Sequence, residues 1–478
     1  MDKRIFCIGR LDKIKNNLDL QVFMRHNRYF FRLVCTALLT FFCTLTFSLL
    51  WRRFVSNFLE KRLLLGVGNT GLACIIYIFT FLIIGNFVHA FKIGVERKSK
   101  LIASVILTVL MTNSIEILFS MAILNNFRYF RSFIWRYALL SAGQCAVCAL
   151  LAYFMVDLYR KLVPPIKVLI VSGNNNDVAF KVNQIFHKYH VEKVLHADEP
   201  DDVIRQEAAK YEAVFINDIP AKKENTIVKM CFDMNKRVYI IPKISDILLK
   251  GSENLNVMDT PLFLCRNIGM SYWERAIKRL FDIVLSGLAI VVLSPLMIIT
   301  AAAIKLEDHG PVFFRQERVT RGGKRFMIIK FRSMIVDAEK DGKPHPAGVA
   351  DDRITRVGRI IRAYRIDELP QLFNIFSGNM SIVGPRPERW EHVEKYKKEI
   401  PEFSFREKVK GGLTGYAQVY GKYNTTALDK LKLDLIYITE FSIILDLQII
   451  IETIKILFMK ESTEGFSEER VKEMQNAA

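Results

Sequence analysis

The chain has 478 residues, of which 51% are hydrophobic, and a formal net charge of +19. That length suits about three domain-sized units. A basic excess suits nucleic acid, an anionic membrane surface or a phosphorylated substrate. Residues 29–158 are dominated by apolar runs, which favour a membrane surface or a phosphorylated substrate over nucleic acid. A nucleic-acid binder is the weakest interpretation, because its phosphate-binding face would compete with membrane segments.

Four stretches near the N-terminus reach the roughly 20 apolar residues that a membrane-spanning helix needs. They are residues 29–50, 64–91, 101–124 and 133–158. The leader, 1–28, is basic, and Arg160, Lys161 and Lys167 follow the fourth stretch. Because positive charge stays on the cytoplasmic side, we expect both ends of this four-helix region, residues 29–163, in the cytoplasm.

Two features inside these apolar stretches invite a functional interpretation. Glu116 lies within the third stretch, and a carboxylate at membrane depth is a functional hint, but we expect it to face a neighbouring helix. Cys145 and Cys148 form a C-x-x-C without a nearby histidine pair. We interpret them as small residues filling a membrane helix, with metal or redox chemistry as the alternative, and expect reduced thiols.

Residues 164–262 read as a small doubly wound, Rossmann-like cytoplasmic domain. Buried parallel strands are predicted at 167–172, 213–217 and 237–241, and a helix at 177–189, and such alternation is typical of parallel sheets. The turn after the first strand begins at Gly173 and continues with three asparagines. It is not G-x-G-x-x-G, which favours a structural or regulatory module over a dinucleotide site.

A further apolar run, 283–304, is interrupted by Ser294 and Pro295 and is flanked by basic residues on both sides. Positive charge on both flanks favours two cytoplasmic ends, and proline kinks a helix. We therefore predict a re-entrant membrane helix over 278–306 that breaks at Ser294-Pro295. A fifth span with a proline kink is the alternative.

The last apolar stretch, 435–458, is predicted to be an amphipathic helix lying in the membrane interface. Gln448, Glu452 and Lys455 fall on one helical face. A polar tail follows at 460–478, and chain ends of this kind fray.

Between these membrane elements lie residues suited to phosphate chemistry. A strand is predicted at 326–331, and a helix that follows Pro370 is predicted to run through Phe376. Arginines recur every third residue from Arg353 to Arg365, and the guanidinium fork binds phosphate oxygens. Asp367-Glu368 precedes Pro370, which is tolerated only in the first turn of a helix. An ionised Asp367 among arginines can attack phosphorus, and Glu368 can hold Mg²⁺. Simple helix capping by the pair is the alternative.

The chain from about residue 272 to 459 resembles the bacterial sugar transferase family, the monotopic phosphoglycosyl transferases. The resemblance rests on an ordered set of motifs and on the Ser294-Pro295 break: KRLFD (278–282), FFRQERV (313–319), KFRSM (330–334), DDRITRVGRIIR (351–362), IDELPQLFNIFSGNMSIVGPRP (366–387), GLTGYAQVYG (412–421) and LDL (445–447). Two departures are Ile366, where leucine is commoner, and Tyr416, where tryptophan is frequent.

The resemblance implies an α/β catalytic domain over 271–459 in the bacterial cytoplasmic membrane, with its active site facing the cytoplasm. A UDP-sugar would be the donor, undecaprenyl phosphate the acceptor and Mg²⁺ the cofactor. Asp367 would be the nucleophile and Glu368 a Mg²⁺ ligand. The four-helix N-terminus together with the small α/β domain resembles the large, exopolysaccharide-initiating subgroup, and association of two copies through the N-terminal regions stays open. The residues expected to bind phosphate are Lys330, Arg332, Arg353, Arg362 and Arg386.

Two other functions remain as alternatives. A membrane sensor or scaffold would have a nucleotide-binding α/β domain and an inert C-terminal domain, which the intact Asp367-Glu368 pair with its arginines argues against. A glycosyltransferase that moves sugar without phosphate would release UDP rather than UMP.

Overall fold

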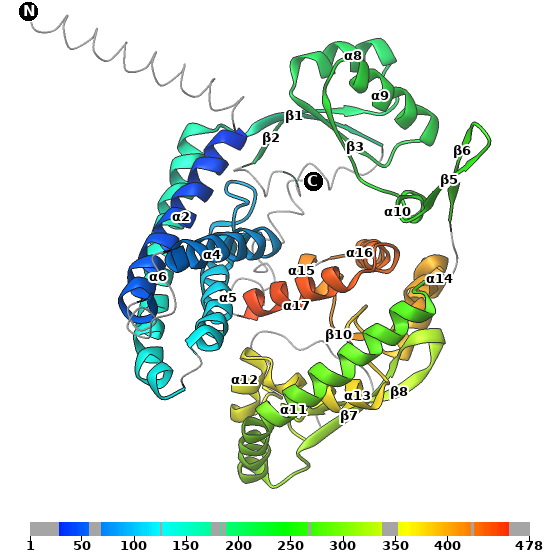
Figure 1. The fold of residues 1–478 in the computed structure, drawn as a ribbon. Helices are drawn as coiled ribbons and strands as arrows, with labels where there is room; N and C mark the ends of the chain where they lie inside the picture. The colour runs from blue at the N-terminus through cyan, green and yellow to red at the C-terminus, as the bar shows by residue number, and fades with distance from the viewer. Residues whose placement is uncertain are drawn as a thin grey trace, which may run out of the picture. The chain divides into compact units, whose positions relative to one another are not determined.

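The computed structural model describes residues 28–56, 68–124, 127–173, 182, 188–265, 269–336, 352–421 and 425–457. The leader before Arg28 and the polar tail therefore lie outside the described residues, and so does the predicted helix at 177–189 as far as His187, except for Val182. The chain divides into two compact units, Met1–Ile241 and Pro242–Met474 (Figure 1). Residues 242–262, which the sequence grouped with the Rossmann-like domain, belong to the second unit.

Four long apolar helices open the first unit, in line with the four predicted stretches. They are α2 (Arg28–Trp51), which continues as a π-helical turn (Arg52–Ser56), α4 (Gly68–Phe87), α5 (Lys98–Leu124) and α6 (Phe127–Leu162). Each contains a segment long and apolar enough to cross a membrane. Their outer faces expose large apolar side chains such as Leu38, Phe79 and Leu150, as lipid contact requires.

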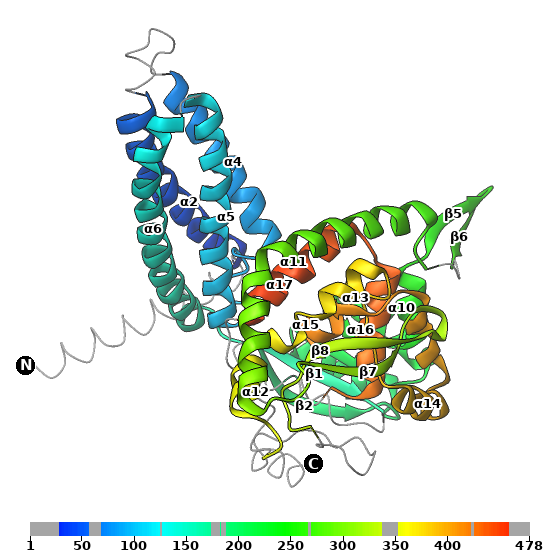
Figure 2. The same cartoon turned by 90° about the horizontal axis from the view of Figure 1, so that it is seen from below.

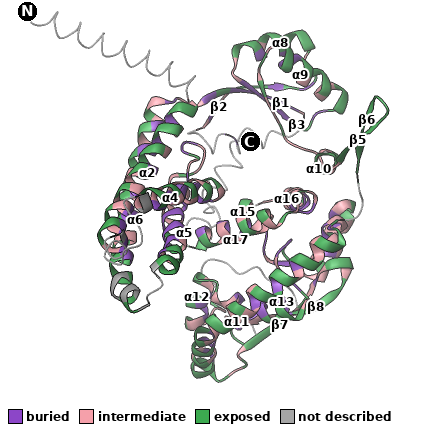
Figure 3. Ribbon diagram, viewed as in Figure 1, coloured by how far each residue is buried: buried purple, intermediate pink, exposed green. Residues whose placement is uncertain are grey.

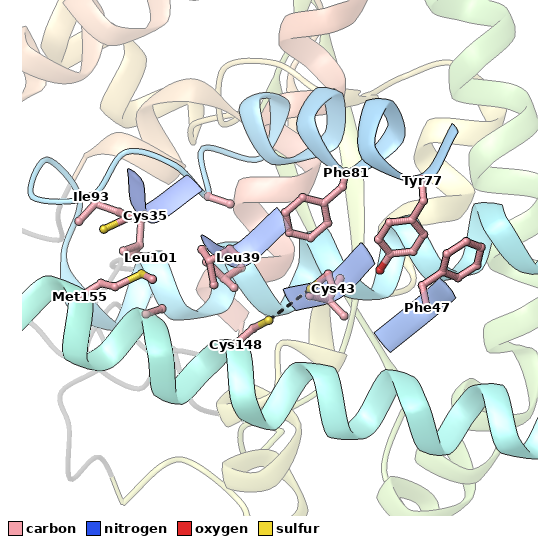
Figure 4. Packing of buried hydrophobic residues seen from close by; sticks show 14 of the residues in the cluster. Cys35, Leu39, Cys43, Phe47, Tyr77, Phe81, Ile93, Leu101, Cys148 and Met155 are labelled. Carbon is pink, nitrogen blue, oxygen red and sulfur yellow. Dashed lines mark hydrogen bonds between the residues drawn. The ribbon is translucent and has the colours of Figure 1, made fainter. Parts of the chain in front are cut away.

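Large side chains fill the centre of this helix bundle (Figure 4). Leu39, Phe47, Tyr77 and Phe81 are buried there, and the rings of Phe47 and Tyr77 stack with centroids 4.4 Å apart. Cys148 is also buried, with its thiol 3.4 Å from that of Cys43. The structure thus gives Cys148 the space-filling role that the sequence predicted.

Polar side chains cross the bundle interior in a connected series. The Tyr77 hydroxyl donates to Asn113 Oδ1 (3.1 Å), the Asn113 amide donates to Gln144 Oε1 (2.7 Å), and Gln144 donates to Thr46 Oγ1 (2.8 Å). Without water, such groups must satisfy one another. Glu116 is 1% exposed, so its carboxyl faces the protein interior, as predicted.

The remainder of the first unit contains a parallel four-stranded sheet in the order β2-β1-β3-β4. The strands are β1 (Ile166–Ser172), β2 (Tyr189–His196), β3 (Ala213–Asn217) and β4 (Arg237–Ile240). Three of them are the predicted strands, and β2 was missed. Helices α8 (Asp201–Lys210) and α9 (Ala221–Asp233) both pack against Leu169, Val171, Val214 and Ile216. Among the described residues these helices therefore cover one sheet face, so the doubly wound arrangement stays a prediction.

The second unit begins with α10 (Ile244–Lys250) and an antiparallel hairpin of β5 (Glu253–Val257) and β6 (Thr260–Leu264). Every residue of both strands is exposed (Figure 3). A second antiparallel hairpin, β7 (Phe313–Val319) and β8 (Arg325–Phe331), follows the long helix α11 (Tyr272–Asp308). The strand predicted at 326–331 is thereby confirmed, whereas β7 was missed.

Short elements build the rest of the second unit. Strands β9 (Ser381–Val383) and β10 (Gly412–Thr414) pair in parallel. The other elements are α12 (Arg356–Ala363), the 3₁₀ turn η3 (Ile366–Glu368), α13 (Gln371–Ser377), α14 (Trp390–Glu399), the 3₁₀ segment η4 (Pro401–Lys408), α15 (Tyr416–Tyr420), α16 (Ala427–Thr439) and α17 (Ile443–Leu457).

Helix α11 (Tyr272–Asp308) contains Pro295 in its interior and changes direction along its length (Figure 2). Proline removes a backbone hydrogen bond and pushes the preceding turn away, which explains the bend. The helix starts at a capping box in which Ser271 and Glu274 exchange hydrogen bonds. It is also long and apolar enough to cross a membrane.

The prediction of one amphipathic helix over 435–458 is wrong. The region forms two helices, α16 and α17, and residues 440–442 between them are not helical. Glu452 and Lys455, expected on a water-facing surface, are buried and form an ion pair, whereas Ile444 and Leu447 are exposed. Apolar periodicity alone does not distinguish a charged face that meets water from one that meets protein.

Candidate active site

Three segments of the second unit converge on the carboxylate of Glu368. Its Oε1 accepts hydrogen bonds from Lys330 Nζ (2.8 Å), at the end of β8, and from Arg386 Nη2 (3.1 Å), in the loop after β9. Arg365 Nη1 lies 3.8 Å from Oε2. The Glu368 residue is 9% exposed. A carboxylate this buried needs charged partners, and here it has three.

Apolar anchors on both sides hold the Asp367-Glu368 pair in place. Ile366 and Leu369 pack against a cluster that contains Met297 and Ile304 of α11. Pro370 is the N-cap of α13, so a helix does begin at this proline, as its position in the sequence predicts. The pair is therefore held over the part of α11 that follows its proline.

Asn374 of α13 links the Asp367-Glu368 segment to the strand that carries Lys330. Its side-chain amide donates to the Met327 carbonyl (2.9 Å), and its Oδ1 accepts from the Ile329 amide (2.9 Å). The Asn374 side chain thus forms hydrogen bonds with the backbone of β8, as a neighbouring strand would, close to Lys330. Sequence reasoning missed this residue, although a lone asparagine within the predicted helix was a usable signal.

The two adjacent carboxylates have opposite electrostatic environments. Burial would raise the pKa of Glu368, but Arg386 and Lys330 outweigh it and hold that pKa well below its usual range. Burial and the neighbouring Glu368 charge raise the pKa of Asp367, although Lys330 and Arg362 oppose them. Burial also lowers the pKa of Lys330. On acidification Glu368 therefore keeps its charge to a lower pH than Asp367 does.

The loop that carries Arg386 is held through its backbone. The Gly384 amide donates to the Thr414 carbonyl (2.9 Å), and a Cβ at Gly384 would lie 2.4 Å from the Lys410 carbonyl oxygen. Arg406 donates to the Arg386 carbonyl (2.9 Å) and pairs with the buried Asp434 (2.8 Å). Burial raises the pKa of Asp434 to about 6 in spite of Arg406. Glycine at position 384 is therefore a packing requirement.

The other predicted phosphate-binding residues lie in different places. Arg362, on α12, is close enough to Asp367 for its charge to lower that pKa. Among the described residues, the ion pairs of Glu368 do not include Arg353, whose carbonyl accepts from the Ile335 amide (2.9 Å).

Arg332 pairs with Asp308 rather than with Asp367 or Glu368. It is 6% exposed, its Nη1 donates to Asp308 Oδ2 (2.6 Å), and its Nη2 pairs with the other Asp308 oxygen. Its Nε donates to the Pro311 carbonyl (2.7 Å). Arg332 thus fastens the end of α11 to the end of β8.

Two arginines near the site were not among the predicted site residues. Arg365 has a left-handed backbone (φ 56°) and points a guanidinium nitrogen at Glu368. Arg318 of β7 donates to Gln316 Oε1 (2.6 Å), and burial beside Arg386 lowers its pKa to about 10. Arg365 belongs to the repeat of arginines at every third residue, which could have pointed to it. The position of Arg318 near the site depends on the pairing of β7 with β8 and could not be read from the sequence.

A Mg²⁺ ion was expected on Glu368. Among the described residues, no group of three or more His, Cys, Asp or Glu side chains could hold a metal. Mg²⁺ commonly binds through one or two carboxylates together with substrate phosphates. The hydrogen bonds from Lys330 and Arg386 use Oε1 of Glu368, so Oε2, 3.8 Å from Arg365 Nη1, is the oxygen that would hold the ion in that mode.

The fold and this cluster define a membrane protein whose second unit gathers cations around two adjacent carboxylates. Residues 273–460 match the family model described as "Bacterial sugar transferase". The UDP-glucose:undecaprenyl-phosphate glucose-1-phosphate transferase of Klebsiella pneumoniae is 35% identical over 70% of this chain and 76% of its own length. The protein of that name in Escherichia coli is 33% identical over 62% of this chain and 68% of its own length.

A third relative matches a shorter part of the chain. The UDP-N-acetylgalactosamine-undecaprenyl-phosphate N-acetylgalactosaminephosphotransferase of Aeromonas hydrophila is 47% identical over 37% of this chain, and the chain spans 43% of that relative's length. The chain belongs to the bacterial sugar transferase family.

The contacts of Arg332 predict that it stabilises the fold. Because lysine cannot make the paired hydrogen bonds of a guanidinium, Arg332→Lys should lower the free energy of unfolding by roughly 1–3 kcal/mol. Asp308→Asn should lower it similarly, and the double variant should be little worse than either. Thermal unfolding of the purified protein measures this. An unchanged melting temperature for Arg332→Lys would contradict the stabilising role.

Proposed function

We propose that this chain transfers a sugar-1-phosphate from a UDP-sugar to undecaprenyl phosphate, releasing UMP and forming undecaprenyl-diphosphate-sugar. This would be the first membrane step in the synthesis of an exopolysaccharide, capsule or O-antigen-type glycan. The observation that carries the proposal is the Asp367-Glu368 pair, with Lys330 and Arg386 on Glu368, inside the segment that matches the family.

Asp367 is the proposed nucleophile. One of its carboxylate oxygens attacks the β-phosphorus, the bond from that phosphorus to the bridging oxygen breaks, and UMP leaves with the electron pair. An oxygen of the lipid phosphate then attacks the same phosphorus, and the Asp367 carboxylate leaves. Each step forms one P–O bond and breaks one, so the enzyme returns to its starting state.

Charge around the pair supports this division of roles. Glu368, with its lowered pKa, stays ionised and holds Lys330 and Arg386 in place. These cations, with Arg362 and Arg365 nearby, can bind the donor's phosphate oxygens. Glu368 Oε2 and the substrate phosphates would hold Mg²⁺, which when bound neutralises charge on the diphosphate and stabilises the departing UMP.

Both ends of α11 support a re-entrant path for this helix. Near its start, Arg279 donates to the Ile375 carbonyl (2.7 Å), and at its end Asp308 pairs with Arg332. Both contacts are made with the second unit. A helix crossing the bilayer would place its ends about 30 Å apart on opposite sides, whereas one that bends at Pro295 returns to the side it entered from. We place that side, and the active site, in the cytoplasm.

Asp367→Asn should abolish turnover, because an amide is a far weaker nucleophile than a carboxylate. The fold should survive, since the two side chains have nearly the same shape. The assay follows nucleotide release from UDP-glucose and from UDP-N-acetylgalactosamine with undecaprenyl phosphate and Mg²⁺, because the named relatives use these two sugars.

Thermal unfolding of the same preparation serves as the control for folding. Substantial UMP release by Asp367→Asn would contradict the covalent route. Release of UDP by the unmodified protein would indicate glycosyl transfer without phosphate.

Activity should depend on pH through the two shifted groups. The raised pKa of Asp367 means that kcat/KM falls on acidification at a higher pH than an ordinary aspartate, about 4, would give. The lowered pKa of Lys330 means that an alkaline loss begins below the usual lysine range.

A kcat/KM profile for UMP release measures both limbs. In Lys330→Arg the alkaline limb should move upward, because arginine keeps its proton. An acid limb at or below pH 4 would contradict the assignment of Asp367 as the titrating nucleophile.

A further inference from the structure

One turn near the start of α11 holds two segments of the site at once. Asp282 Oδ1 accepts from the Ser381 hydroxyl (3.0 Å) and from the Ile382 amide (2.9 Å), both in β9. Three residues earlier on α11, Arg279 donates to the carbonyls of Ile375 (2.7 Å) and Phe376 (2.8 Å), in the last turn of α13. These charged contacts lie on neighbouring positions of one helix face.

The two segments held in this way are the ones that present the ion pair of the active site. Helix α13 begins shortly after Glu368 in the chain, and β9 leads into the loop of Arg386. Glu368 and Arg386 meet at 3.1 Å. The distance between them therefore depends on how β9 and α13 sit relative to each other, and Arg279 and Asp282 attach both to the same helical turn.

The Asp282 carboxylate is buried, so its two hydrogen bonds fix the position of β9. Asp282 is 4% exposed and Ser381 is fully buried. A buried carboxylate loses much of its hydration, so leaving it without donors is costly. Hydrogen bonds to an ionised acceptor are also stronger than neutral ones. Apolar packing would tolerate a small slide of β9 along α11, whereas these two hydrogen bonds do not.

A second connection from α11 reaches β9 by another route. Lys278 pairs with Asp446 of α17 (2.5 Å), and Asp446 accepts from the Tyr437 hydroxyl (2.9 Å). That hydroxyl also lies 3.2 Å from the Val383 carbonyl, the residue before Gly384. Thus the start and the end of β9 are each joined to α11 through polar contacts.

We propose that Asp282, together with Arg279, is a positioning residue for the transfer reaction, holding β9 so that Arg386 meets Glu368. This inference rests on the proposed function, because it assigns Arg386 and Glu368 to the reaction. It links the position of α11 to the reaction, because a displacement of α11 at Asp282 would move Arg386, the proposed phosphate-binding residue.

A double-mutant cycle tests the proposal. The variants are Asp282→Ala, Arg386→Ala and the combination, each assayed for UMP release in the full-length protein. Asp282→Ala should lower kcat/KM on the order of 100-fold, the scale expected when a reacting group is displaced by about 1 Å. The double variant should be no less active than Arg386→Ala alone, because both changes remove the same arrangement.

Two further variants separate positioning from folding. Asp282→Asn keeps an acceptor oxygen of the same shape and should recover most of the activity. Ser381→Ala removes one of the two hydrogen bonds, and should give a smaller loss with the same non-additivity if Asp282→Ala does not fold. Glu317→Gln, in an exposed pair with Arg325, is the control and should leave activity unchanged.

Each outcome bears on one claim or both. Losses that multiply in the double variant, or an Asp282→Ala protein with full activity and a lower melting temperature, would overturn the positioning role while leaving the proposed function intact. An unmodified protein that releases no UMP from any donor would overturn the proposed function, and the positioning role with it.

Discussion

The second unit depends on one buried anion, the carboxylate of Glu368. Lys330 and Arg386 donate to it, and Arg365 lies close by, so the end of β8, the turn η3 and the loop after β9 must all reach one point. Removing any partner would leave charge poorly compensated in a buried place, which is costly. The arrangement also separates the roles of two adjacent carboxylates, since Glu368 is held ionised while the pKa of Asp367 is raised.

In the proposed arrangement, helix α11 connects this anion with the membrane. Its exposed face carries large apolar side chains such as Leu288, Val291 and Ile298, which suits lipid contact. Its other face carries Asp282 and Arg279, which bind β9 and α13. In the proposed reaction the lipid-linked acceptor brings its phosphate to the bilayer surface, and a site assembled on a membrane helix would lie at that level. On this proposal the same helix serves both membrane attachment and the geometry of the ion cluster.

Sequence patterns predicted the features that depend on local order. The apolar helices, the strands β1, β3, β4 and β8, and the helix start at Pro370 are examples, because periodicity and proline act within a few residues. Features that depend on distant partners were not predictable. Arg332 looks like its neighbours in sequence, yet its partner Asp308 lies 24 positions away. The role of Asn374 likewise depends on β8 lying beside α13. Glu452 and Lys455 were expected to face water, but they are buried against other parts of the protein.

The most direct test of this account is to look for the phospho-sugar on Asp367. The protein is mixed with Mg²⁺ and a UDP-sugar it accepts, without undecaprenyl phosphate, and is quenched and digested for mass spectrometry. The account predicts a mass increase of one sugar phosphate on the peptide that contains Asp367, and its loss when undecaprenyl phosphate is added before the quench. Turnover with the full mixture, but no adduct on that peptide without the lipid, would contradict it.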